Sequence, residues 1–96
     1  MKTELAETAT TIEAKLSELE RERLRIGAEG IAVLKRLDPW LAKFAGEIWD
    51  DPEDVADWFT DKVESLGWRT PWQCIARGDR DEVVRILNSI AHGLPA

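Results

Sequence analysis

A polar residue followed directly by proline occurs three times along the chain, at positions 38–39, 51–52 and 70–71. A side-chain oxygen at the first position can accept hydrogen bonds from the free N–H groups of a helix start. Proline suits the first helical position because its missing N–H has no partner there. The sequence lacks strand-length alternation of apolar and polar residues, and it contains no Asn-Gly or Asp-Gly hairpin turn. It therefore predicts an all-α fold, a small helical bundle.

The apolar residues that follow these starts recur with helical spacing. Asp38 and Asp51 precede two runs, whose expected inner faces are Leu41, Phe44, Ala45 and Ile48 in one and Val55, Trp58, Phe59 and Val63 in the other. Thr70 and Gln73 form a capping box that opens a short third helix, and Gly78 ends it.

The last helix has a recognisable start and end. Asp79 is expected to cap its first turn, and His92-Gly93 is expected to close it, because glycine readily adopts the left-handed conformation that ends helices. Its apolar stripe contains Val83, Leu87 and Ile90, widened by Val84 and Ala91.

The first 26 residues carry one narrow apolar stripe. Spacings of four and three connect its members, which are Leu5, Ala9, Ile12, Leu16, Leu19, Arg23 and Ile26. Each glycine costs a helix about 1 kcal/mol relative to alanine, so we expect a break or kink between Gly27 and Gly30. So narrow a stripe buries little within its own chain, which predicts an N-terminal amphipathic helix that forms a homo-oligomer, most simply a dimer. Residues 1–37 would form this oligomerisation segment, and residues 38–96 a second helical unit.

Length and composition limit what the chain can do. Its 96 residues, 44% hydrophobic and 33% charged, describe one small folded domain. No apolar run approaches the roughly 20 residues that cross a bilayer, so we expect a cytoplasmic protein without a membrane partner. With Cys74 as the one cysteine and His92 as the one histidine, a zinc site and a nucleophilic site both lack groups. We expect no metal, no cofactor and no catalysis, and we place Cys74 in the core.

The net charge of −6 arises in the second part of the chain, where residues 37–96 hold six basic and twelve acidic side chains. The window from Asp50 to Asp61 is acidic throughout and would repel a nucleic-acid backbone. It is either a solvated helix face or a surface complementary to a basic partner. Basic residues at 21–25 and 35–36 leave room for a limited DNA contact, although residues 1–36 carry no net charge.

Five tryptophans are many for so short a chain. Trp58 lies within an apolar stripe, and we place it in the core together with Trp40 and Trp49. Trp68 and Trp72 flank a turn beside Arg69, and tryptophan with arginine is typical of interface hot spots. For these two residues the pattern leaves core and interface equally open.

Several segments together resemble a known family. They are Ala56 to Phe59, Leu66 to Pro71, Val83 to Leu87 with Ile90, and His92-Gly93 near the end. Their order and spacing resemble the toxin-binding domain of the Xre/MbcA/ParS antitoxin family. Two features depart from the family pattern: Trp68 stands where a small residue is usual, and the residues before Asp38 are too few for the family's N-terminal helix-turn-helix domain.

The resemblance implies a function and a site. Antitoxins of this kind neutralise RES-domain toxins, which consume NAD or transfer its ADP-ribosyl group, by blocking the toxin's NAD cleft with the C-terminal helix and tail. Carried over to this chain, the toxin-binding residues would be Asn88, Ile90, His92, Gly93, Leu94, Pro95 and Ala96, with Trp68, Arg69 and Trp72 lining the toxin-facing surface. Two other functions stay open, a small DNA-binding transcriptional regulator and a coiled-coil adaptor.

Overall fold

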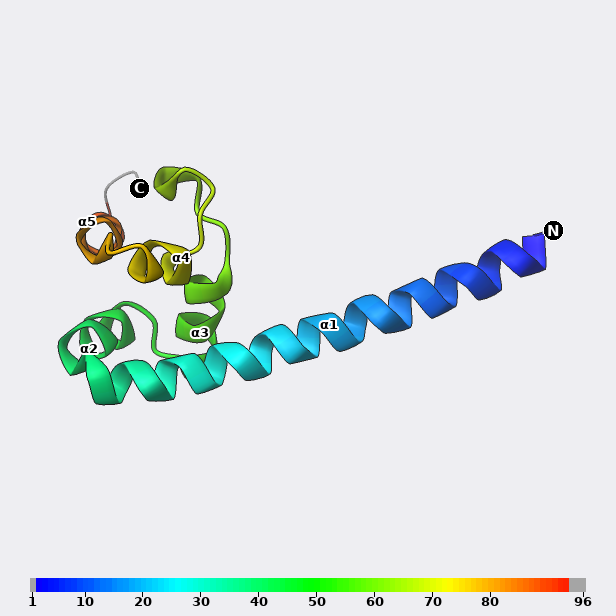
Figure 1. Ribbon diagram of the computed structural model, residues 1–96, viewed down its shortest axis with the longest axis horizontal. Helices are drawn as coiled ribbons and strands as arrows, with labels where there is room; N and C mark the ends of the chain where they lie inside the picture. The colour runs from blue at the N-terminus through cyan, green and yellow to red at the C-terminus, as the bar shows by residue number, and fades with distance from the viewer. Residues whose placement is uncertain (1, 94–96) are drawn as a thin grey trace.

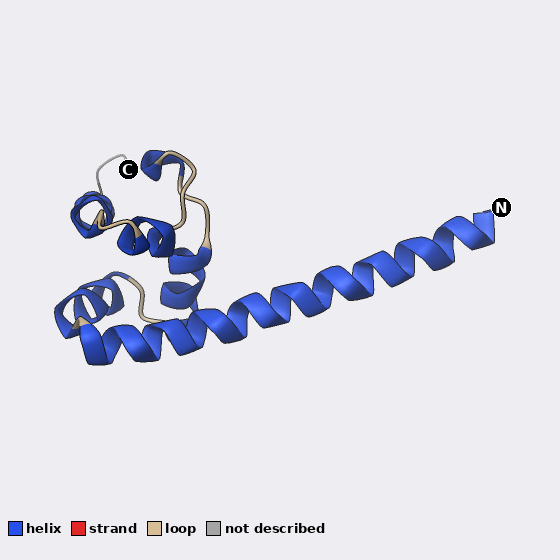
Figure 2. Ribbon diagram, in the orientation of Figure 1, coloured by secondary structure: helices blue, strands red, loops and turns tan. Residues whose placement is uncertain are grey.

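The computed structural model describes residues 2–93, which form five α-helices and one short 3-10 helix (Figures 1 and 2). In chain order these are α1 (Lys2–Leu37), α2 (Pro39–Ile48), α3 (Pro52–Thr60), η1 (Glu64–Leu66), α4 (Pro71–Ala76) and α5 (Arg80–Ala91). Within this range no strand forms, and extended backbone pairs only at a single bridge between Val63 and Arg69. The predicted all-α bundle is confirmed.

Helix α1 determines the shape of the molecule. Its 36 residues span about 54 Å at 1.5 Å per residue, which matches the longest dimension of the molecule, 54 Å against 28 and 27 Å. Figure 1 shows its first half projecting from the rest of the structure. We call residues 2–22 the arm and residues 23–93 the globule. None of the described helices is both long enough and apolar enough to cross a membrane.

The three proline-marked helix starts form as predicted. Asp38 accepts a hydrogen bond from the Leu41 N–H at 3.3 Å, and Asp51 accepts one from the Glu53 N–H at 2.9 Å. Thr70 and Gln73 exchange both bonds of a capping box, at 3.0 and 2.8 Å. These caps fix where α2, α3 and α4 begin, because they satisfy N–H groups that have no partner inside the helix.

The core lies where α1, α2, α3 and α5 meet, and Phe59 is the largest side chain that is fully buried there. Cys74 is fully buried as well, which confirms its predicted place in the core. Ile86 is also fully buried, although the predicted stripe of the last helix omitted it. The other buried members are Ile31, Leu34, Leu41, Ala42, Ala45, Val55, Ala56, Leu66, Val83 and Leu87. Because Ile31 and Leu34 are among them, the C-terminal third of α1 is built into the globule.

The expected break between Gly27 and Gly30 is wrong, since α1 runs through both glycines without interruption. Both positions lie where another helix approaches closely. A Cβ at Gly30 would come within 2.8 Å of the Trp72 ring of α4, and one at Gly27 within 3.3 Å of the Ala56 carbonyl oxygen of α3. The helical cost of glycine is therefore offset by packing that a side chain would prevent.

The predicted apolar stripe of the arm is present and exposed. Leu5, Ile12, Leu16 and Leu19 are between 52% and 72% exposed. Ile26, the last member of the predicted stripe, is also 52% exposed. Arg23 is half-buried, because its guanidinium donates to the Thr60 hydroxyl and pairs with Asp57 of α3. This contact joins the arm to the globule and neutralises part of the acidic window between Asp50 and Asp61.

The contact between Gly30 and Trp72 predicts an unusual response to alanine. Gly30→Ala should lower the free energy of unfolding by about 1–2 kcal/mol, because the new methyl group overpacks against the indole ring. Gly46 of α2 is a matched control, since a Cβ there meets nothing within 4 Å. Gly46→Ala should raise the free energy of unfolding by roughly 0.5–1 kcal/mol. Urea unfolding followed by circular dichroism measures both, and equal stabilisation by the two changes would contradict the packing argument.

Candidate functional site

The turn before α4 presents one large aromatic side chain to solvent. Val63 and Arg69 pair across it, and the Trp68 N–H donates to the Val63 carbonyl oxygen at 3.0 Å. Gly67 and Trp68 both adopt positive φ angles, 69° and 63°. Such a conformation costs a residue with a Cβ about 1–2 kcal/mol. Trp68 is nevertheless 63% exposed, so its ring gains little packing within its own chain.

Arg69 ties this turn to the start of α5. Its Nε donates to the Leu66 carbonyl oxygen at 2.9 Å, and its Nη1 lies 2.8 Å from a carboxylate oxygen of Asp79. Asp79 is the N-cap residue of α5, as predicted, but its carboxylate makes no capping bond and is turned to Arg69 instead. The same pairing raises the pKa of the Arg69 guanidinium. Arg69 is half-buried and holds Trp68 in position through the turn.

Trp72 lies against the core. Its ring centroid is 5.5 Å from that of Phe59, and its ring edge touches Gly30 of α1. The Trp72 ring is half-buried and packs against the core. Its part in the toxin-facing surface stays a prediction. A glycine at position 30 was the sequence signal that could have revealed this contact.

The outer side of α5 carries two of the predicted residues. Asn88 and His92 line a shallow hollow on this face, together with Asp81, Val84, Arg85 and Ser89. His92 Nδ1 lies 2.7 Å from the Asn88 carbonyl oxygen, and Gly93 has a φ of 67°, so the predicted helix end is confirmed. Ile90 packs instead against the core. The predicted site residues Leu94, Pro95 and Ala96 lie outside the described residues.

A second aromatic cluster, which sequence reasoning missed, joins α2 to α5. Trp40 was placed in the core, and this is wrong, since it is 55% exposed and lies against Phe44 at 5.4 Å between ring centroids. The Arg80 guanidinium sits over the Trp40 ring at 5.5 Å and pairs with Asp38, its Nε at 2.6 Å from Oδ2. The arginine lowers the pKa of the Asp38 carboxyl, and the pair raises that of Arg80. Trp49 and Trp58, by contrast, pack against the core as predicted.

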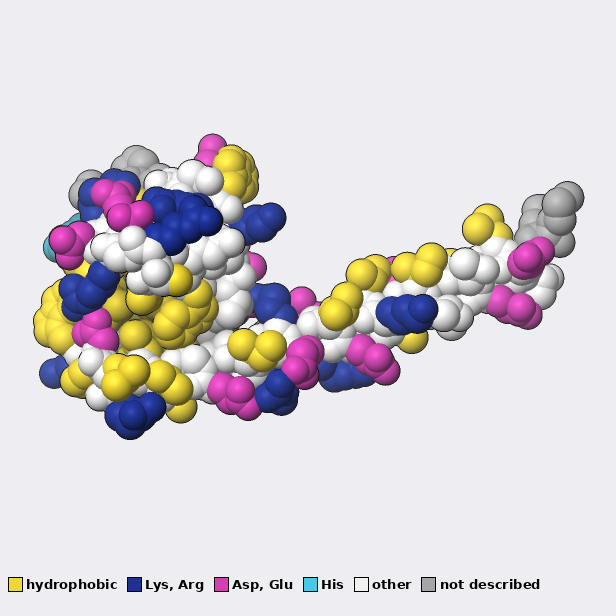
Figure 3. Space-filling model, in the orientation of Figure 1, with side chains coloured by type: hydrophobic (Ala, Val, Ile, Leu, Met, Phe, Trp, Pro, Cys, Tyr) yellow, Lys and Arg dark blue, Asp and Glu magenta, His cyan; other side chains and the backbone are white. Residues whose placement is uncertain are grey.

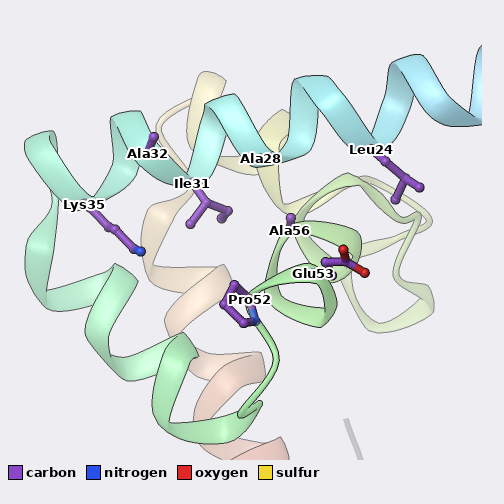
Figure 4. Close-up of a pocket in the computed structure, with 8 residues that line it drawn as sticks. All are labelled: Leu24, Ala28, Ile31, Ala32, Lys35, Pro52, Glu53 and Ala56. Atoms are coloured by element: carbon purple, nitrogen blue, oxygen red, sulfur yellow. The ribbon is translucent and has the colours of Figure 1, made fainter.

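An apolar groove of about 290 Å³ runs between α1 and the start of α3. Figure 4 shows its lining, Leu24, Ala28, Ile31, Ala32, Lys35, Pro52, Glu53 and Ala56. None of the predicted site residues lines it. The groove is therefore separate from the surface formed by the turn and α5.

The arrangement is suited to binding. Cys74 is fully buried while His92 is exposed, so the two do not form a nucleophile-base pair. Among residues 2–93, no group of three or more histidine, cysteine or acidic side chains is placed to hold a metal ion. What the C-terminal half offers is a rigid surface with exposed aromatic and charged side chains, which is typical of a protein interface.

Comparison with known proteins agrees with this interpretation. The sequence model of the antitoxin Xre/MbcA/ParS C-terminal toxin-binding domain matches residues 44–93, more than half of the chain. No curated protein and no solved structure matches the chain. The chain belongs to the Xre/MbcA/ParS antitoxin family. Its C-terminal half is a toxin-binding domain, which implies that its partner is a toxin.

The ion pair between Asp38 and Arg80 predicts a specific response to acid. A carboxyl whose pKa is lowered by folding stabilises the folded state above its unfolded pKa, and this contribution is lost as the pH falls through the lower, folded value. Asp38→Asn keeps a capping side chain and removes the charge. The variant should be less stable than the parent at pH 7 and should lose less stability between pH 5 and pH 2. Chemical unfolding across this range measures both, and parallel pH profiles would contradict a stabilising pair.

Proposed function

We propose that this protein is the antitoxin of a type II toxin-antitoxin system and neutralises a RES-domain toxin. In this proposal the C-terminal end of α5 and the residues after it enter the toxin's NAD cleft and block it. The observation that carries the proposal is the family match over residues 44–93, which includes the turn with Trp68 and all of α5. The protein would act in the cytoplasm, where NAD and the toxin are both present.

The geometry of α5 supports this role for its end. Val83, Ile86 and Leu87 are fully buried, so the helix is fixed firmly in the globule. The final turn is closed by the backbone bond from His92 N–H to the Asn88 carbonyl oxygen at 3.1 Å and by the left-handed Gly93. A helix fixed at its base and capped at its end holds its last turn in one orientation. Such preorganisation lowers the entropy lost on binding.

Trp68 is proposed as an anchor of the toxin interface. Its ring is exposed and its backbone is held in a conformation that disfavours it, so the fold alone gives no reason for a tryptophan here. Tryptophans at the centre of interfaces often contribute several kcal/mol to binding. Arg69 supports this anchor from the side, since its bonds to Leu66 and Asp79 hold the turn in place.

The proposal includes self-association through α1, whose exposed stripe is the reason for it. Regulation through DNA receives less support. Of the basic residues at 21–25, Arg23 pairs with Glu20 and Asp57, and Arg25 pairs with Glu22 and Glu29. These carboxylates offset the positive charge that a phosphate contact requires.

Replacing Trp68 should separate stability from binding. Trp68→Gly should leave the free energy of unfolding unchanged or raise it by up to about 1 kcal/mol, because glycine tolerates the positive φ. Affinity for the toxin should fall by about 2 kcal/mol, roughly 30-fold. Trp40→Ala is the control, since Trp40 is similarly exposed and lies outside the predicted site. Calorimetry against the co-expressed toxin tests this, and unchanged affinity for Trp68→Gly would remove Trp68 from the interface.

Deleting residues 92–96 should abolish neutralisation. The globule should stay folded, because the buried residues of α5 end at Leu87 and the packed ones at Ile90. Circular dichroism and melting temperature check the fold, while NAD consumption by the toxin checks inhibition. We expect a folded variant that binds the toxin weakly or binds without inhibiting it. Complete inhibition by this variant would show that the C-terminal end is not the blocking element.

A further inference from the structure

The exposed stripe of the arm lies on the same side of α1 as the globule. At 100° per residue, residues 27, 30 and 34 fall on the same face of α1 as Leu5, Ala9, Ile12, Leu16 and Leu19. Gly27, Gly30 and Leu34 face α3, α4 and the core. Figure 3 shows hydrophobic side chains along the edge of the arm that faces the same side as the globule. One face of α1 therefore changes from buried to exposed at Arg23.

This placement restricts how a second copy can cover the stripe. Packed helices run about 8–10 Å apart, whereas the molecule is 27–28 Å across its two shorter dimensions. In a parallel pair both globules would lie between the two helices at the same height along the helix axis. The space between two packed helices is too narrow to hold them. In an antiparallel pair each globule lies beyond the tip of the other arm. Only the antiparallel arrangement covers the stripe over its full length.

Charge selects the register of this pair. When Leu5 faces Leu16 of the second copy, Ala9 faces Ile12, and a small side chain meets a large one. On the flanks of the stripe this register sets Lys15 against Thr8 of the second copy and Glu13 against Ala6, so like charges do not meet. A shift by one heptad would instead place Lys15 against Lys15 and Glu13 against Glu13. The favoured register also sets position 2 opposite position 19, one turn before Arg23 and the globule.

We infer that the protein forms an antiparallel dimer through its arms, in the register that pairs Leu5 with Leu16. This inference rests on the proposed self-association and adds its geometry. At 1.5 Å per residue, the two globules are centred about 58 Å apart along the helix axis. Each dimer then presents two toxin-binding surfaces, one at each end.

Disulfide trapping distinguishes the two orientations. In a Cys74→Ala background, Leu5→Cys and Leu16→Cys are made as separate variants, one of them with a tag that changes its mass. Under mild oxidation the mixture should give the mixed disulfide dimer, and each variant alone should give little. Efficient linking of Leu5→Cys to itself would indicate parallel arms and overturn the inference. A monomer in light scattering at concentrations of about 100 μM would overturn it as well, since dimerisation follows mass action.

A new charge pair tests the register. Thr8→Glu should tighten the dimer by roughly two- to tenfold, because the added carboxylate meets Lys15 of the second copy, twice by symmetry. A weaker dimer would reject this register, because a shift by one heptad would set the added carboxylate against Glu22. Leu16→Glu with Leu19→Glu should give a monomer that still binds and inhibits the toxin one to one. The two proposals fail in different measurements. If the unmodified protein did not bind the toxin, the proposed function would be contradicted and the dimer would be unaffected. If the unmodified protein were a monomer, the dimer would be contradicted and the proposed function would be unaffected.

Discussion

The packing of the Trp72 ring against Gly30 is the contact on which the structure most depends. It brings α4 against a helix that starts 69 residues earlier in the chain, and it requires a residue without a side chain at the point of contact. Phe59 packs against the same ring at 5.5 Å between ring centroids, so α1, α3 and α4 meet at one aromatic cluster. Because α4 is only six residues long, it has little stability of its own and takes its place from this contact.

Three arginines then join elements that are distant in sequence. Arg23 connects α1 to α3, Arg69 connects the turn after η1 to the start of α5, and Arg80 connects α5 to the start of α2. All three guanidinium groups are partly exposed, so each pair contributes modestly to the free energy of folding. These pairs mainly fix the orientation of the elements that they join, because a planar guanidinium sets the direction of its partner. They hold the exposed rings of Trp68 and Trp40 on a rigid surface.

Local features of the structure could be predicted from the sequence, and distant contacts could not. The caps at Asp38, Asp51 and Thr70 and the end at Gly93 depend on neighbouring residues, and all four were found. Gly30 was misread because the reason for it, Trp72, lies 42 positions away. Trp40 was misplaced for a similar reason, since it lies against an arginine that no spacing rule identifies. Asp79 is the predicted N-cap residue, but its carboxylate pairs with Arg69 and makes no capping bond. The family resemblance compares many positions of the chain at once. It pointed to the same half of the chain that the family model matches.

The continuity of α1 also limits how proteins with this architecture can vary in length. One residue inserted into the arm would turn the stripe by about 100° relative to the globule, and its apolar face would point to another side. Seven residues would keep the stripe nearly in line and would lengthen the arm by about 10 Å. Gene variants of this protein should therefore differ in arm length by whole heptads. The arm can therefore change its length in steps of seven residues without turning its apolar face away from the side of the globule.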